Sequence, residues 1–394
     1  MTLKVSAFTA TSCIGRGTQA MLATLRAQRT GLAPCPSVPY GLDTYVGEVP
    51  GVDAVQLPRE LADFDCRNNR LAYMGLQQDG FAARVGDCLA RLGPARVGVF
   101  LGTSTSGILE TEQAFAARDA HSGALPSWFH YAGAHSTYSV AAFTLRALGI
   151  EGPAAVISSA CSSSAKVFAS AQRAIAAGLI DAAVVGGVDS LCLTTLHGFN
   201  SLQLVSVKPV RPFDVARDGL SIGEAAAFAL LERAEASPAS QALLLLGSGE
   251  SSDAHHMSAP HPEGRGAREA MQRALKAAGL DPGRIDYINL HGTGTPSNDE
   301  AEARAVHAVL GDVPGSSTKG ATGHTLGAAG ALEAVICLLA LREGLMPAGV
   351  NTTQLDPALE VNYVLQNRAA ALQCVMSNSF GFGGSNCSLV FARG

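Results

Sequence analysis

The segment Ala154-Ala155-Val156-Ile157-Ser158-Ser159-Ala160-Cys161-Ser162-Ser163-Ser164-Ala165-Lys166 joins a short apolar run to a run of small residues. The apolar run does not alternate with polar residues, which is typical of a strand buried on both faces of its sheet. The serines after Cys161 favour the start of a helix, because their hydroxyls can cap free backbone N–H groups. The segment therefore predicts a buried strand, a turn at the cysteine and a helix, as in a layered α/β protein.

The same alternation of apolar runs and alanine-rich runs continues along the chain. We expect strands at residues 4–8, 97–101, 155–159, 182–185, 226–231, 242–247, 285–290, 375–378 and 388–391. We expect helices at residues 18–27, 69–92, 162–177, 266–278, 299–310 and 327–342. A connector at 232–241, which contains Pro238, separates two of these strands. We place a domain boundary there, between residues 1–240 and 241–394.

The composition excludes several classes of protein. The 394 residues are 47% hydrophobic and 15% charged, so the chain is globular rather than disordered. A net charge of −5 gives no general attraction for nucleic acid or an anionic membrane, and no segment is apolar enough to span a bilayer. An odd number of cysteines, nine, favours reduced thiols, and the residues after Met1 do not resemble a secretory signal. We expect a cytoplasmic protein without nucleic-acid or membrane partners.

Cys161 is the first candidate for chemistry. At the start of a helix, the helix dipole and free backbone N–H groups favour the thiolate, which is the nucleophilic form of cysteine. An inert core thiol fits the same position equally well. The neighbouring serines are better explained as helix caps than as nucleophiles, and no Gly-x-Ser-x-Gly turn typical of serine hydrolases is present.

Two histidines lie in glycine-rich segments, and the first of them follows an apolar run. His291 opens His291-Gly292-Thr293-Gly294-Thr295-Pro296, where the glycines allow close approach of a ligand and the threonines offer hydroxyls. A phosphate loop fits poorly, because its Gly-Lys-Ser/Thr ending is missing. Lys319 lies five residues before His324 in a stretch without other charges, which favours a buried functional lysine over a surface lysine.

A fourth motif surrounds Phe382. The glycines of Phe380-Gly381-Phe382-Gly383-Gly384 predict a turn that could present a backbone N–H to a reacting group. A plain hairpin explains the same residues when they are considered alone.

One cysteine, two histidines and one lysine on strand-end loops together resemble the thiolase superfamily. More narrowly, the chain is similar to the decarboxylating 3-oxoacyl-[acyl-carrier-protein] synthases with a Cys-His-His triad. Six ordered motifs carry the resemblance over nearly the whole chain: Leu101-Gly102-Thr103-Ser104, Ala160-Cys161-Ser162-Ser163, Arg211-Pro212-Phe213-Asp214 with Arg217-Asp218-Gly219, His291-Gly292-Thr293-Gly294-Thr295-Pro296, Lys319 with Gly323-His324, and Phe380-Gly381-Phe382-Gly383-Gly384. It implies an α/β fold of the thiolase-like five-layer αβαβα type with two similar halves, and a dimer joined through the strand at 154–159.

The resemblance also implies an activity. Cys161 would take an acyl chain from acyl-carrier protein, and condensation with malonyl-carrier protein, with loss of carbon dioxide, would elongate it in fatty-acid or polyketide/polyene-type biosynthesis. Backbone N–H groups of Cys161 and Phe382 would hold the oxyanion, His291 and His324 the enolate, and Phe382 would gate the acyl pocket. No metal and no cofactor of the chain's own is implied, because phosphopantetheine belongs to the carrier protein.

Further roles come from the same resemblance. Lys319 is expected to form a hydrogen-bond network with Glu302, and Asp299 is expected to be a second supporting residue. The other implied residues are Thr293 and Thr295 for pantetheine, Thr105 and Tyr131 for the acyl pocket, and Arg67, Arg70 and Lys208 for carrier docking. Polar residues at the two pocket positions favour a specialised acyl chain.

Two other functions stay open. The first is a non-catalytic subunit that sets chain length in a heterodimeric synthase, although such subunits typically lack the nucleophile. The second is a thiolase or acyltransferase acting on coenzyme A esters, which would need a second reactive cysteine near Gly383-Gly384. Cys374 and Cys387 flank that loop but do not match the required position. Both a homodimer and a heterodimer with a chain-length-factor-like subunit are compatible with the sequence.

Overall fold

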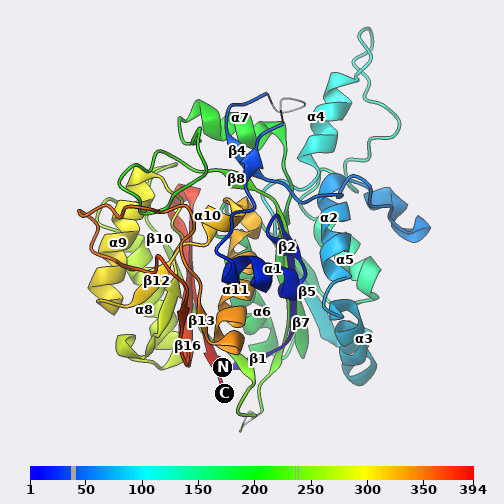
Figure 1. Ribbon diagram of the computed structural model, residues 1–394. Coiled ribbons are helices and arrows are strands. Elements are labelled where there is room, and N and C mark those ends of the chain that lie inside the picture. The colour runs from blue at the N-terminus through cyan, green and yellow to red at the C-terminus, as the bar shows by residue number, and fades with distance from the viewer. Residues whose placement is uncertain (37–40, 236, 238) are drawn as a thin grey trace.

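The computed structural model describes residues 1–36, 41–235, 237 and 239–394 (Figure 1). Pro238 of the predicted connector lies outside the described residues. The strands of one large mixed sheet form two runs. The first run contains β1 (Leu3–Ser12), β5 (Val97–Gly102), β6 (Ala154–Ile157), β7 (Ala182–Asp189) and β9 (Ala225–Arg233). The second contains β10 (Leu243–Ser252), β11 (Tyr287–Asn289), β12 (Pro314–Ser316), β16 (Cys374–Gly381) and β17 (Ser385–Arg393).

The two runs share one topology. The spatial orders are β6-β5-β7-β9-β1 and β12-β11-β16-β17-β10, so each run places its third, second, fourth, fifth and first strands side by side. In both runs the fifth strand is antiparallel to its two neighbours, while the remaining pairs are parallel. The runs meet where Leu3 of β1 pairs with Leu245 of β10. This repetition confirms the predicted α/β fold with two similar halves, whereas the boundary at residue 240 stays a prediction.

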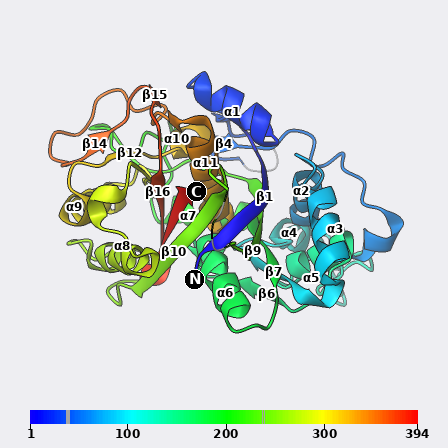
Figure 2. The same ribbon diagram turned by 90° about the horizontal axis from the view of Figure 1, so that it is seen from below.

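Helices lie outside both runs and between them (Figures 1 and 2). The longer helices are α1 (Thr18–Arg26), α2 (Arg67–Leu76), α3 (Phe81–Leu92), α4 (Ile108–Ala116), α5 (Ser139–Leu148), α6 (Ser163–Ala176), α7 (Leu193–Ser201), α8 (Arg265–Ala278), α9 (Pro296–Leu310) and α11 (Ala329–Glu343). The short α10 (Lys319–Thr322) precedes α11, and the small strands are β2 (Gly15–Arg16), β3 (Ala33–Pro34), β4 (Tyr45–Gly47), β8 (Ile222–Gly223), β13 (Leu345–Met346), β14 (Asn362–Tyr363) and β15 (Arg368–Ala369). Among the described residues, no helix has the length and hydropathy that crossing a membrane requires.

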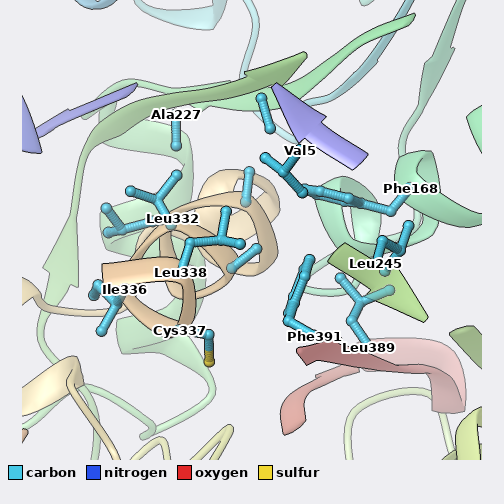
Figure 3. Close-up of a cluster of buried hydrophobic side chains, with 14 of the residues drawn as sticks. Val5, Phe168, Ala227, Leu245, Leu332, Ile336, Cys337, Leu338, Leu389 and Phe391 are labelled. Atoms are coloured by element: carbon cyan, nitrogen blue, oxygen red, sulfur yellow. The ribbon is translucent and has the colours of Figure 1, made fainter. Parts of the chain in front are cut away.

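The middle layer consists of α6 and α11. Every residue from Ala329 to Leu341 of α11 is buried, as expected for a helix that is apolar on all sides. In Figure 3, Leu332 of α11 lies towards Ala227 of β9, and Leu338 belongs to the same cluster as the labelled residues of β1, β10 and β17. A side chain at Gly330 would lie 2.6 Å from the backbone nitrogen of Ala165, so glycine there permits α11 to pack closely on α6. The start of both helices is therefore held at one place, next to Cys161.

One predicted helix is wrong. Residues 69–92 form two helices, α2 and α3, because Asp79 and Gly80 adopt left-handed φ angles of 55° and 68°. The Asp79 carboxylate accepts hydrogen bonds from the Thr18 backbone N–H (2.9 Å) and hydroxyl (2.8 Å) at the start of α1. This contact with a distant segment ends the helix, and local sequence does not reveal it.

Candidate active site

Cys161 lies in a tight turn between β6 and α6. Ala160 has a left-handed φ of 53°, which is strained for a residue with a side chain. The Ser163 hydroxyl accepts a hydrogen bond from the Ser159 N–H (2.9 Å) and donates one to the Ala160 carbonyl (2.5 Å). Ser162 lies at the N-cap of α6 but forms no side-chain capping bond. The prediction that the serines cap the helix is therefore wrong, and they fix the turn instead.

Both predicted histidines meet the cysteine. His324 Nε2 lies 3.0 Å from Cys161 Sγ, and the His291 and His324 rings are 5.3 Å apart at 85°. His324 follows α10, and its backbone is held by the Ser221 carbonyl at 2.7 Å. The cysteine therefore comes from the first run of the sheet and both histidines come from the second.

Burial sets the charge state of this triad. It raises the pKa of the Cys161 thiol to about 12, although Lys319 and the backbone N–H of Phe382 oppose the rise. Burial, and then the Lys319 ammonium, hold the pKa of His324 and of His291 well below 6.5. In the free protein, desolvation therefore opposes the favourable field at the helix start and favours a neutral thiol beside two neutral imidazoles.

Lys319 fixes His291. Its Nζ donates to the His291 carbonyl at 2.6 Å and lies 3.4 Å from His291 Nδ1. Because an ammonium can only donate, Nδ1 accepts and the imidazole proton lies on Nε2, which faces the site. The third Nζ contact is an ion pair with Glu333.

The predicted pairing of Lys319 with Glu302 is wrong, because Glu333 of α11 takes that place. Both partners are almost fully buried, at 1% and 3% side-chain exposure. Burial raises the pKa of Glu333 to about 7 against the opposing effect of Lys319. Glu333 is the one charged residue between Ala329 and Leu341, and a lone carboxylate in a buried helix is a signal that could have identified it from sequence.

Glu302 and Asp299 instead hold the backbone of the His291 loop. Glu302 accepts hydrogen bonds from the N–H groups of His291 (2.8 Å) and Gly292 (2.7 Å) and from Asn378 Nδ2 (3.2 Å). Asp299 accepts from the N–H groups of Thr293 (3.1 Å) and Phe213 (2.8 Å). Both carboxylates therefore position the loop from α9.

Glu302→Ala is expected to lower the free energy of unfolding by about 3 kcal/mol, because three buried donors lose their acceptor. Chemical denaturation followed by circular dichroism measures the change. The matched control is Glu300→Ala on the same helix, whose carboxylate is 45% exposed and ion-paired with Arg217. The control should cost less than about 1 kcal/mol, and equal losses in both variants would contradict the role of Glu302.

A cavity of about 50 Å³ opens in front of the triad. Thr293 and Thr295 line it, and their buried hydroxyls lie 2.8 Å from each other; their binding of pantetheine stays a prediction. The ring of Phe382 lies 5.4 Å from that of Phe199 at the same cavity. The volume is far below the roughly 300 Å³ of small-ligand pockets, so an acyl chain needs side chains to move. Phe382 lies in a turn with left-handed glycines, Gly383 and Gly384, which suits such movement.

The two predicted acyl-pocket residues do not reach this cavity. The Thr105 hydroxyl is buried and donates to Asp189 at 2.8 Å, so it fixes a loop instead of lining the pocket. Tyr131 is 63% exposed on the segment between α4 and α5, which also exposes Trp128.

The predicted docking residues also differ from expectation. Arg67 is 3% exposed and forms ion pairs with Glu224 and Asp53, both at 2.6 Å, so it cannot meet a partner. Arg70 is paired with Asp65 at 2.6 Å. Lys208 is exposed and remains available.

Comparisons with known proteins agree with this geometry. The family model of the beta-ketoacyl synthase N-terminal domain matches residues 4–237, and that of the C-terminal domain matches residues 243–353. A 3-oxoacyl-[acyl-carrier-protein] synthase 2 of Synechocystis is 35% identical over 88% of the chain and 86% of the relative. The mitochondrial 3-oxoacyl-[acyl-carrier-protein] synthase of Arabidopsis thaliana is 41% identical over 62% of the chain, and the aligned part spans only 57% of that relative.

A solved structure gives a match over the full chain. The ketosynthase of Xenorhabdus doucetiae, determined in complex with its chain length factor, is 39% identical. The superposition has a TM-score of 0.89 and covers 100% of this chain and 98% of the other. The fold and the arrangement of the two halves are therefore shared over the whole length.

Proposed function

The chain belongs to the beta-ketoacyl synthase family, and on that premise we propose that it is a 3-oxoacyl-[acyl-carrier-protein] synthase. It takes an acyl chain from acyl-carrier protein onto Cys161 and elongates it by decarboxylative condensation with malonyl-carrier protein. The observation that carries the proposal is the 3.0 Å contact of His324 Nε2 with Cys161 Sγ, beside a second imidazole.

Acyl transfer starts from the neutral pair. His324 accepts the thiol proton as the sulfur attacks the thioester carbonyl of the acyl-carrier protein. The oxyanion that forms is stabilised by the backbone N–H groups of Cys161 and Phe382. When the intermediate collapses, the proton passes from His324 to the leaving pantetheine thiolate, so Cys161 carries the acyl group and His324 is neutral again.

Condensation uses both imidazoles as donors. The ring proton of His324 moves from Nδ1 to Nε2 once Cys161 is acylated and no longer supplies a thiol proton there. The thioester oxygen of malonyl-carrier protein then accepts hydrogen bonds from Nε2–H of His291 and of His324, and loss of carbon dioxide leaves an enolate on that oxygen. The enolate carbon attacks the acyl group on Cys161 and expels the Cys161 thiolate, which takes up a proton from solvent water. Neutral imidazoles suit this step, because a carboxylate would repel the negative charge and Lys319 holds the His291 proton on Nε2.

The proposal needs no cofactor of the chain itself. Thr293 and Thr295 would bind the phosphopantetheine arm that the carrier brings. The ligand atoms of Cys161, His291 and His324 lie within 4.8 Å of one another and would also suit a thiol-binding metal such as Zn²⁺. A metal bound there would block the Cys161 sulfur. The proposed acyl transfer therefore uses the metal-free site, and a chelator should not lower its rate.

Intact-mass spectrometry tests the proposal. The protein is incubated with acyl-carrier proteins of differing chain length and polarity, with and without a chelator, and then with malonyl-carrier protein. We expect the acyl mass on the protein, followed by a 3-oxoacyl-carrier protein longer by two carbons. No acyl mass from any donor, or loss of activity on chelation, would contradict the proposal, and the former would favour a chain-length-determining subunit.

The pH dependence of acylation is a separate prediction. Because burial holds the pKa of His324 well below 6.5, this base stays neutral as the pH falls to that value. The acylation rate measured by quenched-flow mass spectrometry should be level from pH 8 to pH 6.5 and fall only at lower pH. A rate that rises about tenfold per unit over this interval would instead indicate a thiolate formed by simple titration of Cys161.

We further propose a dimer joined through the edge strand β6, whose residues are half-buried in the single chain. The partner is a second copy or a chain-length-factor-like subunit, with this chain as the catalytic half. The 39% identity to a ketosynthase solved with its chain length factor supports a heterodimer. All nine cysteines are free, which supports a reducing compartment such as the cytoplasm.

A further inference from the structure

Three arginines lie on the outer surface where α8 packs on α9. Arg265 and Arg268 border a surface hollow of about 360 Å³. Arg304 of α9 is exposed, and one of its nitrogens donates to the Pro262 carbonyl at 2.7 Å. Across residues 1–36, 41–235, 237 and 239–394, Arg265 and Arg268 form no ion pair, so both guanidinium groups are free to meet a partner.

The acidic side chains beside these arginines do not neutralise them. Glu263 is exposed, and Glu269 lies in the same hollow as Arg268. Glu269 is already engaged, because it forms an ion pair with Arg273 at 2.5 Å. Glu300 and Glu360 share a hollow with Arg304, but Glu300 is already ion-paired with Arg217 at 3.3 Å. The surface formed by Arg265, Arg268 and Arg304, here called the arginine surface, therefore carries, among the described residues, three guanidinium groups against two carboxylates without an arginine partner, Glu263 and Glu360, and is net positive.

The arginine surface adjoins the catalytic cavity. A side chain at Gly266, next to Arg265, would collide with the side chains of Asp253 and Asn386, and both of these residues line the cavity. On α9, Ser297 and Asn298 line the cavity as well. Arg304 lies about 10 Å farther along that helix, at 1.5 Å per residue. A partner bound there would stand directly beside the cavity mouth.

The other side of the molecule has the opposite character. There Arg67 is buried among carboxylates and Arg70 is paired with Asp65. The same segment exposes Glu60 and Asp63. An acidic protein would be repelled from this surface, because like charges facing each other disfavour association.

We propose that acyl-carrier protein docks through its acidic surface on Arg265, Arg268 and Arg304. This inference rests on the proposed function, since it assigns the docking surface of that reaction's carrier. Carboxylates of the carrier pair with the guanidinium forks, which favour such planar partners. The phosphopantetheine arm then enters the cavity past Asn298 and reaches Cys161.

The test compares two acyl donors. The double variant Arg265→Glu/Arg268→Glu should raise the KM for acyl-carrier protein about tenfold, because charge reversal opposes the encounter. The kcat/KM for the same acyl group on free pantetheine should change less than about twofold, since no protein docks. At an ionic strength of about 0.5 M, the KM values of wild type and double variant for acyl-carrier protein should lie closer together, because salt screens the charges. Arg84→Glu on α3, exposed and on the opposite side from α8 (Figure 2), is the charge control.

The outcomes separate the two proposals. A wild type that accepts acyl groups from neither donor would overturn the proposed function. A wild type that accepts both, with a double variant whose KM for the carrier is unchanged, would overturn the docking surface alone. The docking surface would also be overturned if the double variant lost activity equally with both donors. It would likewise be overturned if Arg84→Glu raised the KM for the carrier as much as the double variant does. The milder double variant Arg265→Gln/Arg268→Gln should also raise the KM for acyl-carrier protein, but by less than the charge reversal does.

Discussion

Cys161→Ala is expected to gain no acyl mass from any acyl-carrier protein that acylates the wild type. The substitution removes only the sulfur atom from a residue that is 5% exposed, so the fold should persist. Acylation should fall by at least about a thousandfold, because no other group near His324 can form the covalent intermediate. Intact-mass spectrometry of both proteins after the same incubation measures the loss.

Cys192→Ala is the matched control. Cys192 is also buried, and its pKa is likewise raised to about 12 by burial, but its sulfur contacts the Thr195 hydroxyl at 3.2 Å instead of an imidazole. This variant should be acylated like the wild type. Acyl mass on Cys161→Ala, or its loss from Cys192→Ala, would contradict the assignment of the nucleophile.

Lys319→Met is expected to have the second largest effect. It leaves Glu333 buried without its cation, which costs about 3–5 kcal/mol of the free energy of unfolding. It also frees His291 Nδ1, so the imidazole proton is no longer fixed on the nitrogen that faces malonyl-carrier protein. Condensation should fall about a hundredfold, measured as carbon dioxide release from malonyl-carrier protein, while acylation of Cys161 falls less.

The pH dependence of stability offers a further check on this variant. Without Lys319, the pKa of Glu333 should lie even farther above its unfolded value than the present value of about 7. An acid whose folded pKa is raised loses stability as the pH rises above the unfolded pKa, here near 4.5. Lys319→Met should therefore be less stable at pH 8 than at pH 5, relative to the wild type.

The double variant Lys319→Met/Glu333→Met separates folding from chemistry. Removing both charges together should restore most of the lost stability, because no unpaired ion remains. Condensation should stay low, since the donor to His291 is still missing. Recovery of condensation along with stability would show that Lys319 acts only through the fold.

Cys161 and His291 could be predicted because each lies where an apolar strand ends, whereas Lys319 and His324 stood out through their glycine-rich, otherwise uncharged surroundings. Cys161 and His291 both follow such strands, and the carboxyl ends of parallel strands in one layer lie on one edge of the sheet. The predicted bounds of α8 and α9 likewise differ from the structure by at most three residues at either end, since both helices have clear patterns of small and apolar residues.

Features that depend on distant contacts were not predictable. The lone carboxylate of α11 marks Glu333 as unusual in the sequence, but only the packed middle layer shows that Glu333 rather than Glu302 faces the Lys319 ammonium. The strand β12, Pro314–Ser316, has a sequence that disfavours strands and exists because β11 and β14 flank it. Burial of Arg67 in an ion-pair cluster is equally invisible in the sequence around it.

The repeated strand order also bears on how one polypeptide came to hold two different kinds of chemistry. Cys161 follows the third strand of the first run, and Lys319 and His324 follow the third strand of the second. The nucleophile and the imidazole therefore occupy matching loops of two matching units. Two identical units facing each other would present two cysteines or two histidines. Joining the units in one chain lets each loop differ from its counterpart, so an asymmetric pair of reacting groups arises from a nearly symmetric framework.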